Sequence, residues 1–153
     1  MPSTFEKLNL KNHHKRIFVL NAPESFEHEL ANLHDVTIVR HLQGQDDIQF
    51  SLAFVTKQQE LDTLGKAIAK RAKGDSVVWF AYPKGTSKRY KSELSRDNGW
   101  EVLGKLGFEG VRSVAIDDDW SGARFRRTEF IKTMNRARQY AMSPQGQARP
   151  AKK

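Results

Sequence analysis

The stretch Ser76–Ser87, SVVWFAYPKGTS, decides the predicted fold. Six apolar or aromatic residues run without interruption from Val77 to Tyr82, and the chain then becomes polar from Pro83 onward. An apolar run of this length without alternation is typical of a strand that is buried on both faces of a parallel sheet. Because open α/β sheets bind ligands beyond the carboxyl ends of their strands, the turn after this strand is a candidate binding position.

The composition is that of one domain with a basic extension. The chain has 153 residues, no cysteine and a net charge of +8. Residues 1–123 hold 17 basic and 17 acidic residues, whereas the last 30 residues hold nine basic residues and one acid. The lack of cysteine excludes disulfides and thiolate chemistry, and no apolar stretch approaches the roughly 20 residues of a membrane span. We therefore expect a cytoplasmic protein without membrane contact, whose basic tail attracts polyanions.

Hydrophobic periodicity predicts strands and helices on both sides of this stretch. After an irregular lead-in over residues 1–15, helices are predicted over residues 23–35, 56–73 and 97–106. A capping box at Thr56–Gln59 opens the second helix and Gly74 closes it. Residues 84–98 form a long loop. The predicted strands are Arg16–Leu20, Val36–Leu42, Ile48–Val55, Ser76–Tyr82, Val111–Ile116 and Ala123–Arg127.

The order of these elements predicts an α/β fold, a three-layer Rossmann-like sandwich with a mainly parallel sheet. Right-handed crossovers favour the strand order 2-1-3-4-6-5, with the last strand antiparallel. This order resembles the Rossmann-like methyltransferase fold, in which a final hairpin reverses one strand into the sheet. We expect the domain over residues 1–127, a basic amphipathic helix over 128–142 and a disordered tail over 143–153.

Two motifs resemble a bacterial family of domains of unknown function. The first is VVWFAYPKGTS, Val77–Ser87, with its YPK turn. The second is VAIDDDWSGARFRR, Val114–Arg127, a closing hairpin of the pattern DDxWSGxR. The likeness extends to KRIFVLNAPESF near the start of the chain, so it covers roughly residues 8–127. The resemblance implies a fold and no established activity, and it therefore transfers no catalytic residues.

A ligand site is expected where the strand order reverses, between the first and third strands. Backbone amides at two helix N-termini would converge there and suit an anion. The turn after the first strand, NAPES, contains no glycine, whereas methyltransferases and dehydrogenases place a glycine-rich turn there, which argues against S-adenosylmethionine. The sequence does not identify a cofactor, and a vestigial scaffold whose loops only cap helices stays open. The candidate ligand-binding residues are Asn21, Glu24, Thr56, Lys57, Tyr82, Lys84, Thr86 and Ser87.

Basic side chains form a second candidate site, for nucleic acid. The loop after the central strand combines cations with Tyr90, and the C-terminal residues predict a basic helix. Both patterns suit phosphate groups. A solvated loop, and a helix that docks on the domain through Phe130 and Met134, are the alternatives without a ligand. The candidate residues are Lys88, Arg89, Lys91, Arg127, Lys132, Arg136 and Arg138.

The acidic trio Asp117-Asp118-Asp119 could be read as a metal site. Adjacent carboxylates point in different directions, however, so we expect a hairpin turn whose Asp oxygens accept backbone amides, with Trp120 packed on the core. The five histidines lack metal-binding spacing and no nucleophile motif occurs. We therefore predict no metal site and assign no catalytic residue.

The sequence thus favours a small Rossmann-like domain that could hold an anionic or nucleotide-like ligand at its switch point. One alternative is a nucleic-acid-associated protein that uses its basic loop and C-terminal helix. A second alternative is a degenerate methyltransferase-like enzyme.

Overall fold

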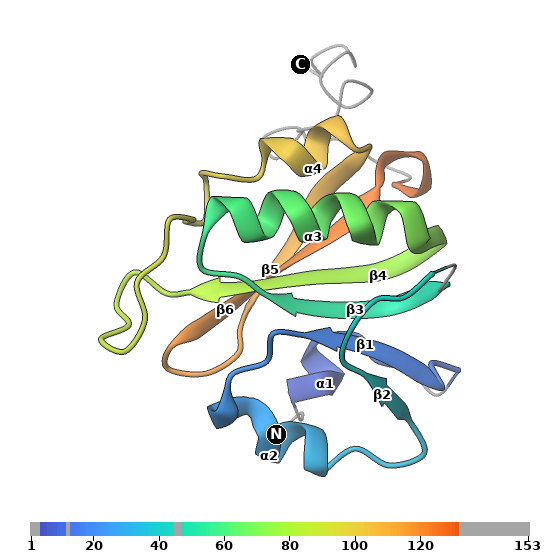
Figure 1. Ribbon diagram of the computed structural model, residues 1–153, viewed down its shortest axis with the longest axis horizontal. Coiled ribbons are helices and arrows are strands. Elements are labelled where there is room, and N and C mark those ends of the chain that lie inside the picture. Colours follow the sequence, from blue (N-terminus) through green and yellow to red (C-terminus); the bar gives the residue numbers. More distant parts are fainter. Residues whose placement is uncertain (1–3, 12, 45–46, 132–153) are drawn as a thin grey trace.

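The computed structural model describes residues 4–11, 13–44 and 47–131, which form one six-stranded sheet with helices on both faces (Figure 1). The strand order is β2-β1-β3-β4-β6-β5. The strands β1 to β4 are parallel, whereas β6 runs antiparallel to both of its neighbours, β4 and β5. The predicted order and the reversed last strand are therefore confirmed. The strands are β1 (Arg16–Leu20), β2 (Thr37–Val39), β3 (Ile48–Phe54), β4 (Ala72–Pro83), β5 (Phe108–Ala115) and β6 (Trp120–Arg127).

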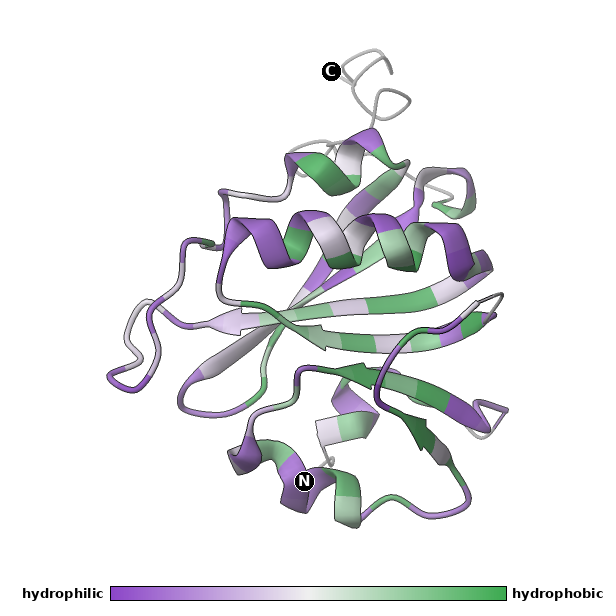
Figure 2. Cartoon of the chain, in the orientation of Figure 1, coloured by the Kyte–Doolittle hydropathy of each residue, from purple (hydrophilic) through white to green (hydrophobic). Residues whose placement is uncertain are grey.

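Two hydrophobic clusters, one on each face of the sheet, produce the three layers. Helices α3 and α4 cover one face, where Leu61 and Leu103 are buried, and the N-terminal helices cover the other, where Phe5 and Leu30 are buried. Figure 2 shows the central strands as largely hydrophobic and the loop after β4 as largely hydrophilic. Among the described residues the helical segments are α1 (Thr4–Lys7), η1 (Glu24–Phe26), α2 (Glu27–Ala31), α3 (Gln58–Arg71), α4 (Glu101–Lys105) and η2 (Thr128–Phe130).

The central strand is β4, as predicted. It lies between β3, to which it is parallel, and β6, and no residue from Val77 to Tyr82 is more than 6% exposed. Trp79 is fully buried, and its indole N–H donates a hydrogen bond of 2.7 Å to the carbonyl of Leu8. A buried indole needs such an acceptor. The apolar run therefore forms the centre of the sheet and packs against both helical layers.

The junction between α3 and β4 differs from the prediction. The helix ends at Arg71 and β4 begins at Ala72, four residues before the predicted start. Gly74 does not cap the helix; with a φ of +65° it lies in a bulge, where β4 gains extra residues between the pairs Ile48↔Ala72 and Phe50↔Val77. The physical reason is that the guanidinium of Arg127 caps the helix, donating to the carbonyls of Ala69 and Ala72 at 2.8 and 2.6 Å.

Several element boundaries also differ. The N-terminal segment contains the short helix α1, because Phe5 and Leu8 are buried on the sheet and hold the chain in place. The edge strand β2 is shorter than predicted. It pairs with β1 alone, over three residues. The final hairpin is longer than predicted, with β5 beginning at Phe108 and β6 at Trp120.

Of the predicted C-terminal helix over residues 128–142, the structure describes residues 128–131, which form the 3-10 segment η2 followed by Ile131 in an extended conformation; residues 132–142 lie outside the described residues. The predicted tail over residues 143–153 lies entirely outside them. In the part of the chain that the structure describes, no helix has the length and hydrophobicity needed to span a membrane.

Candidate functional site

The predicted switch point lies at the carboxyl ends of β1 and β3. Asn21 follows β1 directly and has a φ of +59°, a left-handed conformation that Asn tolerates better than most residues. Its side-chain amide donates to the carbonyl of Phe54 at the end of β3, over 3.4 Å. A polar side chain of the chain itself therefore bridges the crevice between these two strands.

The first loop does not supply a strong helix N-terminus. Glu24 is exposed and begins η1, a single 3-10 turn of three residues, and α2 continues for five residues more. The helix dipole acts at the end of a longer array of aligned peptides, so such short segments offer an anion little attraction. The expected convergence of two helix N-termini is thus reduced to one, that of α3.

The N-terminus of α3 is capped by Glu60. One oxygen of this carboxylate accepts from the amides of Thr56 and Lys57 at 2.8 and 3.1 Å, and from the Thr56 hydroxyl at 3.2 Å. Burial raises the pKa of Glu60, but the hydrogen bonds from Thr56 and Lys57 outweigh it and hold the pKa below its ordinary value. The predicted capping box at Thr56–Gln59 is wrong, because Lys57 is the N-cap residue and Glu60 stands at the third helical position.

A second carboxylate reaches the same helix end from the long loop after β4. Glu93 accepts from the amide of Gln58 at 2.9 Å, and its own amide donates to the carbonyl of Thr56 at 2.9 Å. The side-chain amide of Gln58 donates to the carbonyl of Gly99 at 2.8 Å, near the other end of the loop. These contacts fasten the loop to α3, and we call Glu60, Glu93 and Gln58 the closing residues. The amides of Thr56, Lys57 and Gln58 all bind carboxylates of the protein.

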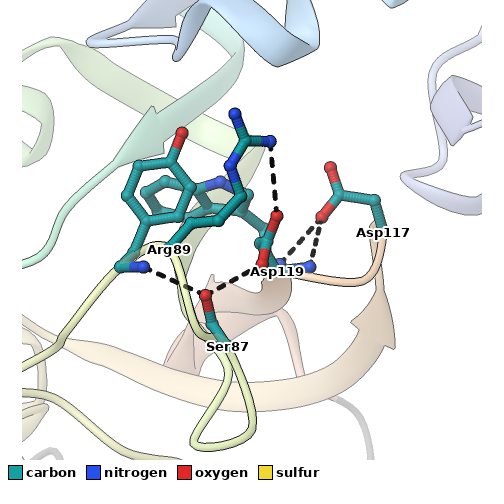
Figure 3. A network of polar contacts seen from close by, with 6 residues as sticks. Ser87, Arg89, Asp117 and Asp119 are labelled. Carbon is teal, nitrogen blue, oxygen red and sulfur yellow. Dashed lines mark hydrogen bonds and ion pairs between the residues drawn. The ribbon is translucent and has the colours of Figure 1, made fainter.

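The turn after β4 is hydrogen-bonded to the turn of the final hairpin. The Ser87 hydroxyl donates to Asp119 at 2.9 Å and accepts from the amide of Tyr90 at 3.1 Å (Figure 3). The Lys84 amide donates to the Asp119 carbonyl at 2.8 Å, and Thr86 is exposed. The turn after β4 and the acidic turn therefore form one structural unit, joined by two residues, Ser87 and Asp119, that are 32 positions apart in the sequence.

Tyr82 lies on the opposite face of the sheet from this unit. Its ring packs 5.3 Å from that of Trp100, in the cluster under α3 and α4. Burial raises the pKa of Tyr82, and hydrogen bonds with Ser121 and Ser113 oppose part of that rise. The structure does not bring the predicted ligand-binding residues together, since Tyr82 and Ser87 point to different sheet faces.

The acidic trio forms a turn, as expected. Asp117 accepts from the amides of Asp119 and Trp120 at 2.8 and 2.9 Å, and the Trp120 ring is buried 5.0 Å from that of Phe54. The carboxylates thus stabilise the hairpin. Within the described ranges, no three His, Asp or Glu side chains are grouped to hold a metal ion.

The predicted nucleic-acid-binding residues are also dispersed. Lys88, Arg89 and Lys91 are exposed on the loop, and Arg89 lies 3.8 Å from Asp119. Arg127 caps α3 and stacks on the Phe108 ring at 4.7 Å, which gives it a structural contact. The other three predicted residues, Lys132, Arg136 and Arg138, lie outside the described residues.

Sequence reasoning missed the two carboxylates that close this site. Glu60 had a usable signal, because it stands three residues after the residue that becomes the N-cap. Glu93 had none, because its partner Gln58 is 35 residues away and the loop between them has no periodic pattern.

Comparisons with known proteins support the fold. No protein-family model matches the chain, and a sequence search of curated proteins finds no match. Among solved structures, it is similar to a SAM-dependent methyltransferase from Aquifex aeolicus, with a TM-score of 0.53 and 12% identity over 81% of this chain and 87% of that one. It is also similar to DhpI in complex with SAH, with a TM-score of 0.50 and 13% identity over 82% and 83%. A LepI complex with SAH and a substrate analogue gives a TM-score of 0.50 and 12% identity over 80% of this chain and 38% of that one.

These similarities establish a Rossmann-like methyltransferase fold for this chain. At 12–13% identity they concern the architecture alone, and they carry no residue roles.

Proposed function

We propose that the chain is a methyltransferase-fold domain that has lost its cofactor site and acts as a binding domain without methyl transfer. The observation that carries the proposal is the pair of carboxylates, Glu60 and Glu93, at the N-terminus of α3. In a fold of this type a ligand approaches the carboxyl ends of the strands and uses free backbone amides there. In this protein the amides of Thr56, Lys57 and Gln58 donate to these two carboxylates.

Electrostatics disfavours a second kind of ligand at this position, a small anion. An anionic group within about 4 Å of the half-buried Glu60 would meet a repulsion on the order of 4 kcal/mol at the effective dielectric of a protein surface, and the exposed Glu93 would add about 1 kcal/mol at the dielectric of water. The helix terminus contributes about 0.3–2 kcal/mol in favour of an anion, which is too little to compensate. The closing residues therefore disfavour the small anionic ligand that the sequence suggests at Asn21, Thr56 and Lys57.

The backbone at the switch point supports it as well. The first turn contains no glycine, so side chains occupy the space that a close approach of cofactor to backbone requires. The Asn21 amide spans the strand ends, and the contacts of Gln58 and Glu93 hold the long loop over α3. Binding at this position would have to break these internal hydrogen bonds.

The test is calorimetric titration of the full chain with S-adenosylmethionine and S-adenosylhomocysteine, together with the melting temperature. The proposal predicts no saturable heat and an unchanged melting temperature, because a ligand that binds the native state must stabilise it. Saturable binding with one site and a raised melting temperature would contradict the proposal.

Such binding would support a second candidate, a methyltransferase-like enzyme with an unusual cofactor pose. The observation that favours this candidate is the left-handed backbone at Asn21, the conformation that a glycine usually supplies in a cofactor turn. In that case the double variant Thr56→Ala and Lys57→Ala should abolish the melting shift, whereas Lys70→Ala, at an exposed position in the last turn of α3, should not.

A further inference from the structure

Three arginines lie on one face of the final hairpin. Arg124 and Arg126 are two residues apart on β6, so their side chains point to the same side of the sheet. Arg112 on β5 stands directly opposite Arg124. A Cβ atom at Gly122, two residues before Arg124, would meet Trp79, which packs on the side of the sheet that carries α1. Arg124 and Arg126 therefore lie on that face. We call these residues, Arg112, Arg124 and Arg126, the arginine face.

A bulge creates this arrangement. The register passes from Gly110↔Phe125 to Arg112↔Arg124, so Val111 is an extra residue on β5. In a regular ladder without the bulge, Arg112 would pair with Ala123 and its side chain would point to the opposite side of the sheet, because a shift of one residue reverses the face. The bulge thus brings two arginines into direct opposition across two antiparallel strands.

Internal acids compensate the arginine face incompletely. Asp75 forms a bidentate ion pair with Arg126, at 2.7 and 2.6 Å, and Glu109 is buried opposite Arg126. Asp75 also acts electrostatically on Arg124, so its single negative charge is shared between two guanidinium groups. Arg112 is exposed, and Arg124 Nε is buried without a hydrogen-bond partner among the described residues. Like charges directly opposite each other destabilise a sheet unless a counter-charge lies between them.

The charge of Arg124 also acts on the N-terminal segment, at the buried His14. His14 is buried, and its Nδ1 accepts from the amide of Lys11 at 2.9 Å, which leaves the ring hydrogen of the neutral form on Nε2. Burial and the charges of His13, Lys11 and Arg124 lower the pKa of His14. The neutral His14 thus adds no charge of its own, and it lies within the electrostatic influence of Arg124, just before the start of β1.

We infer that the arginine face binds the phosphate backbone of a nucleic acid. Guanidinium groups match phosphate oxygens in geometry, and an anion between Arg112 and Arg124 would relieve their mutual repulsion. An extended polyanion is favoured over a single phosphate because the sequence that follows β6, residues 128–153, holds six basic residues and one acid. This inference does not depend on the absence of a cofactor.

The test measures binding of the full chain to fluorescent single-stranded RNA and DNA of about 20 nucleotides by anisotropy, over a range of salt concentrations. The charge-reversing variant Arg112→Glu changes an exposed side chain, so it should fold normally. We expect it to weaken binding by about tenfold or more and to reduce the salt dependence by roughly one unit of slope. The matched control Lys66→Glu, exposed on α3 on the opposite face of the sheet, should change affinity by less than about twofold.

Three outcomes would overturn the inference. Equal losses in Arg112→Glu and Lys66→Glu would show attraction by net charge alone. An unchanged affinity in Arg112→Glu, with binding abolished by the triple variant Lys132→Gln, Arg136→Gln and Arg138→Gln, would assign binding to the chain end. Displacement of the oligonucleotide by an equal concentration of inorganic phosphate, at matched ionic strength, would reveal a site for a single small anion.

Discussion

Ser87 donates a hydrogen bond from its hydroxyl to the carboxylate of Asp119 over 2.9 Å, and this contact joins the turn after β4 to the turn before β6. The same Asp119 accepts the Lys84 amide at its backbone carbonyl. The two turns that the sequence marks as motifs are therefore parts of one structure at the end of the central strands (Figure 3). Their residues stabilise each other, and this role accounts for the polar side chains in both turns.

Replacing Asp119 should destabilise the hairpin. Asp119→Ala removes the acceptor of the Ser87 hydroxyl, and we expect the free energy of unfolding to fall by about 1–2 kcal/mol, the usual effect of a lost charge-assisted hydrogen bond. Urea denaturation measures this change. The neighbouring Asp118→Ala alters an exposed carboxylate and should stay within about 0.5 kcal/mol. Similar effects of the two variants would contradict the proposed contact.

Glu60 should make the stability depend on pH in a defined direction. Its pKa is lower in the folded chain than in the unfolded one, so its charged form stabilises the fold above the unfolded value of about 4.5. That contribution is lost as the pH falls through the folded pKa. The difference in unfolding free energy between the native chain and Glu60→Ala should be about 1 kcal/mol at pH 7 and should shrink below pH 4. A difference independent of pH between 7 and 3 would rule out the charged cap.

Arg127 should be important for stability. Arg127→Gln removes the cap on the α3 carbonyls and the stacking on Phe108, and we expect a loss of about 1–3 kcal/mol. Arg127→Lys should recover only part of it, because lysine keeps the charge but lacks the planar fork that reaches two carbonyls. Thermal and urea unfolding report this ranking. If Arg127→Gln proved neutral, the arginine cap would have no energetic role.

The contact of Glu93 should protect the long loop from proteolysis. The loop over residues 84–99 carries Lys84, Lys88, Arg89, Lys91 and Arg96, all potential trypsin sites. Glu93→Ala removes the bond to the Gln58 amide, so local opening becomes easier and cleavage in the loop should accelerate about three- to tenfold. Asp97→Ala changes an exposed carboxylate in the same loop and serves as the control. An equal cleavage rate in native protein and Glu93→Ala would show that this contact does not fasten the loop.

The fold could be predicted because its signals are local or follow from general handedness. The run from Val77 to Tyr82 is apolar on both faces, and right-handed crossovers then leave few strand orders. The missed features depend on contacts between distant segments. Arg127 caps the C-terminus of α3 from more than 50 residues away, and Gly74 lies in a bulge of β4. Glu93 accepts a hydrogen bond from the amide of Gln58, a contact that the sequence pattern does not indicate.

The topology predicted which strand ends meet at the switch point, but not the contacts that the side chains make there. The strand ends at Asn21 and Thr56 do lie side by side, as the topology requires. The sequence could not reveal that carboxylates of the protein accept from the amides of Thr56, Lys57 and Gln58 at the start of α3. The opposition of Arg112 and Arg124 was equally hidden, because it depends on one bulged residue, Val111.

The most direct test of the closed switch point is an amide NMR titration of the full chain with S-adenosylhomocysteine in excess. We predict that the resonances of Asn21, Thr56, Lys57 and Gln58 do not move, because their environment is completed by Glu60, Glu93 and the Phe54 carbonyl. Saturable shifts confined to these resonances would contradict the account and show that the site still accepts the cofactor.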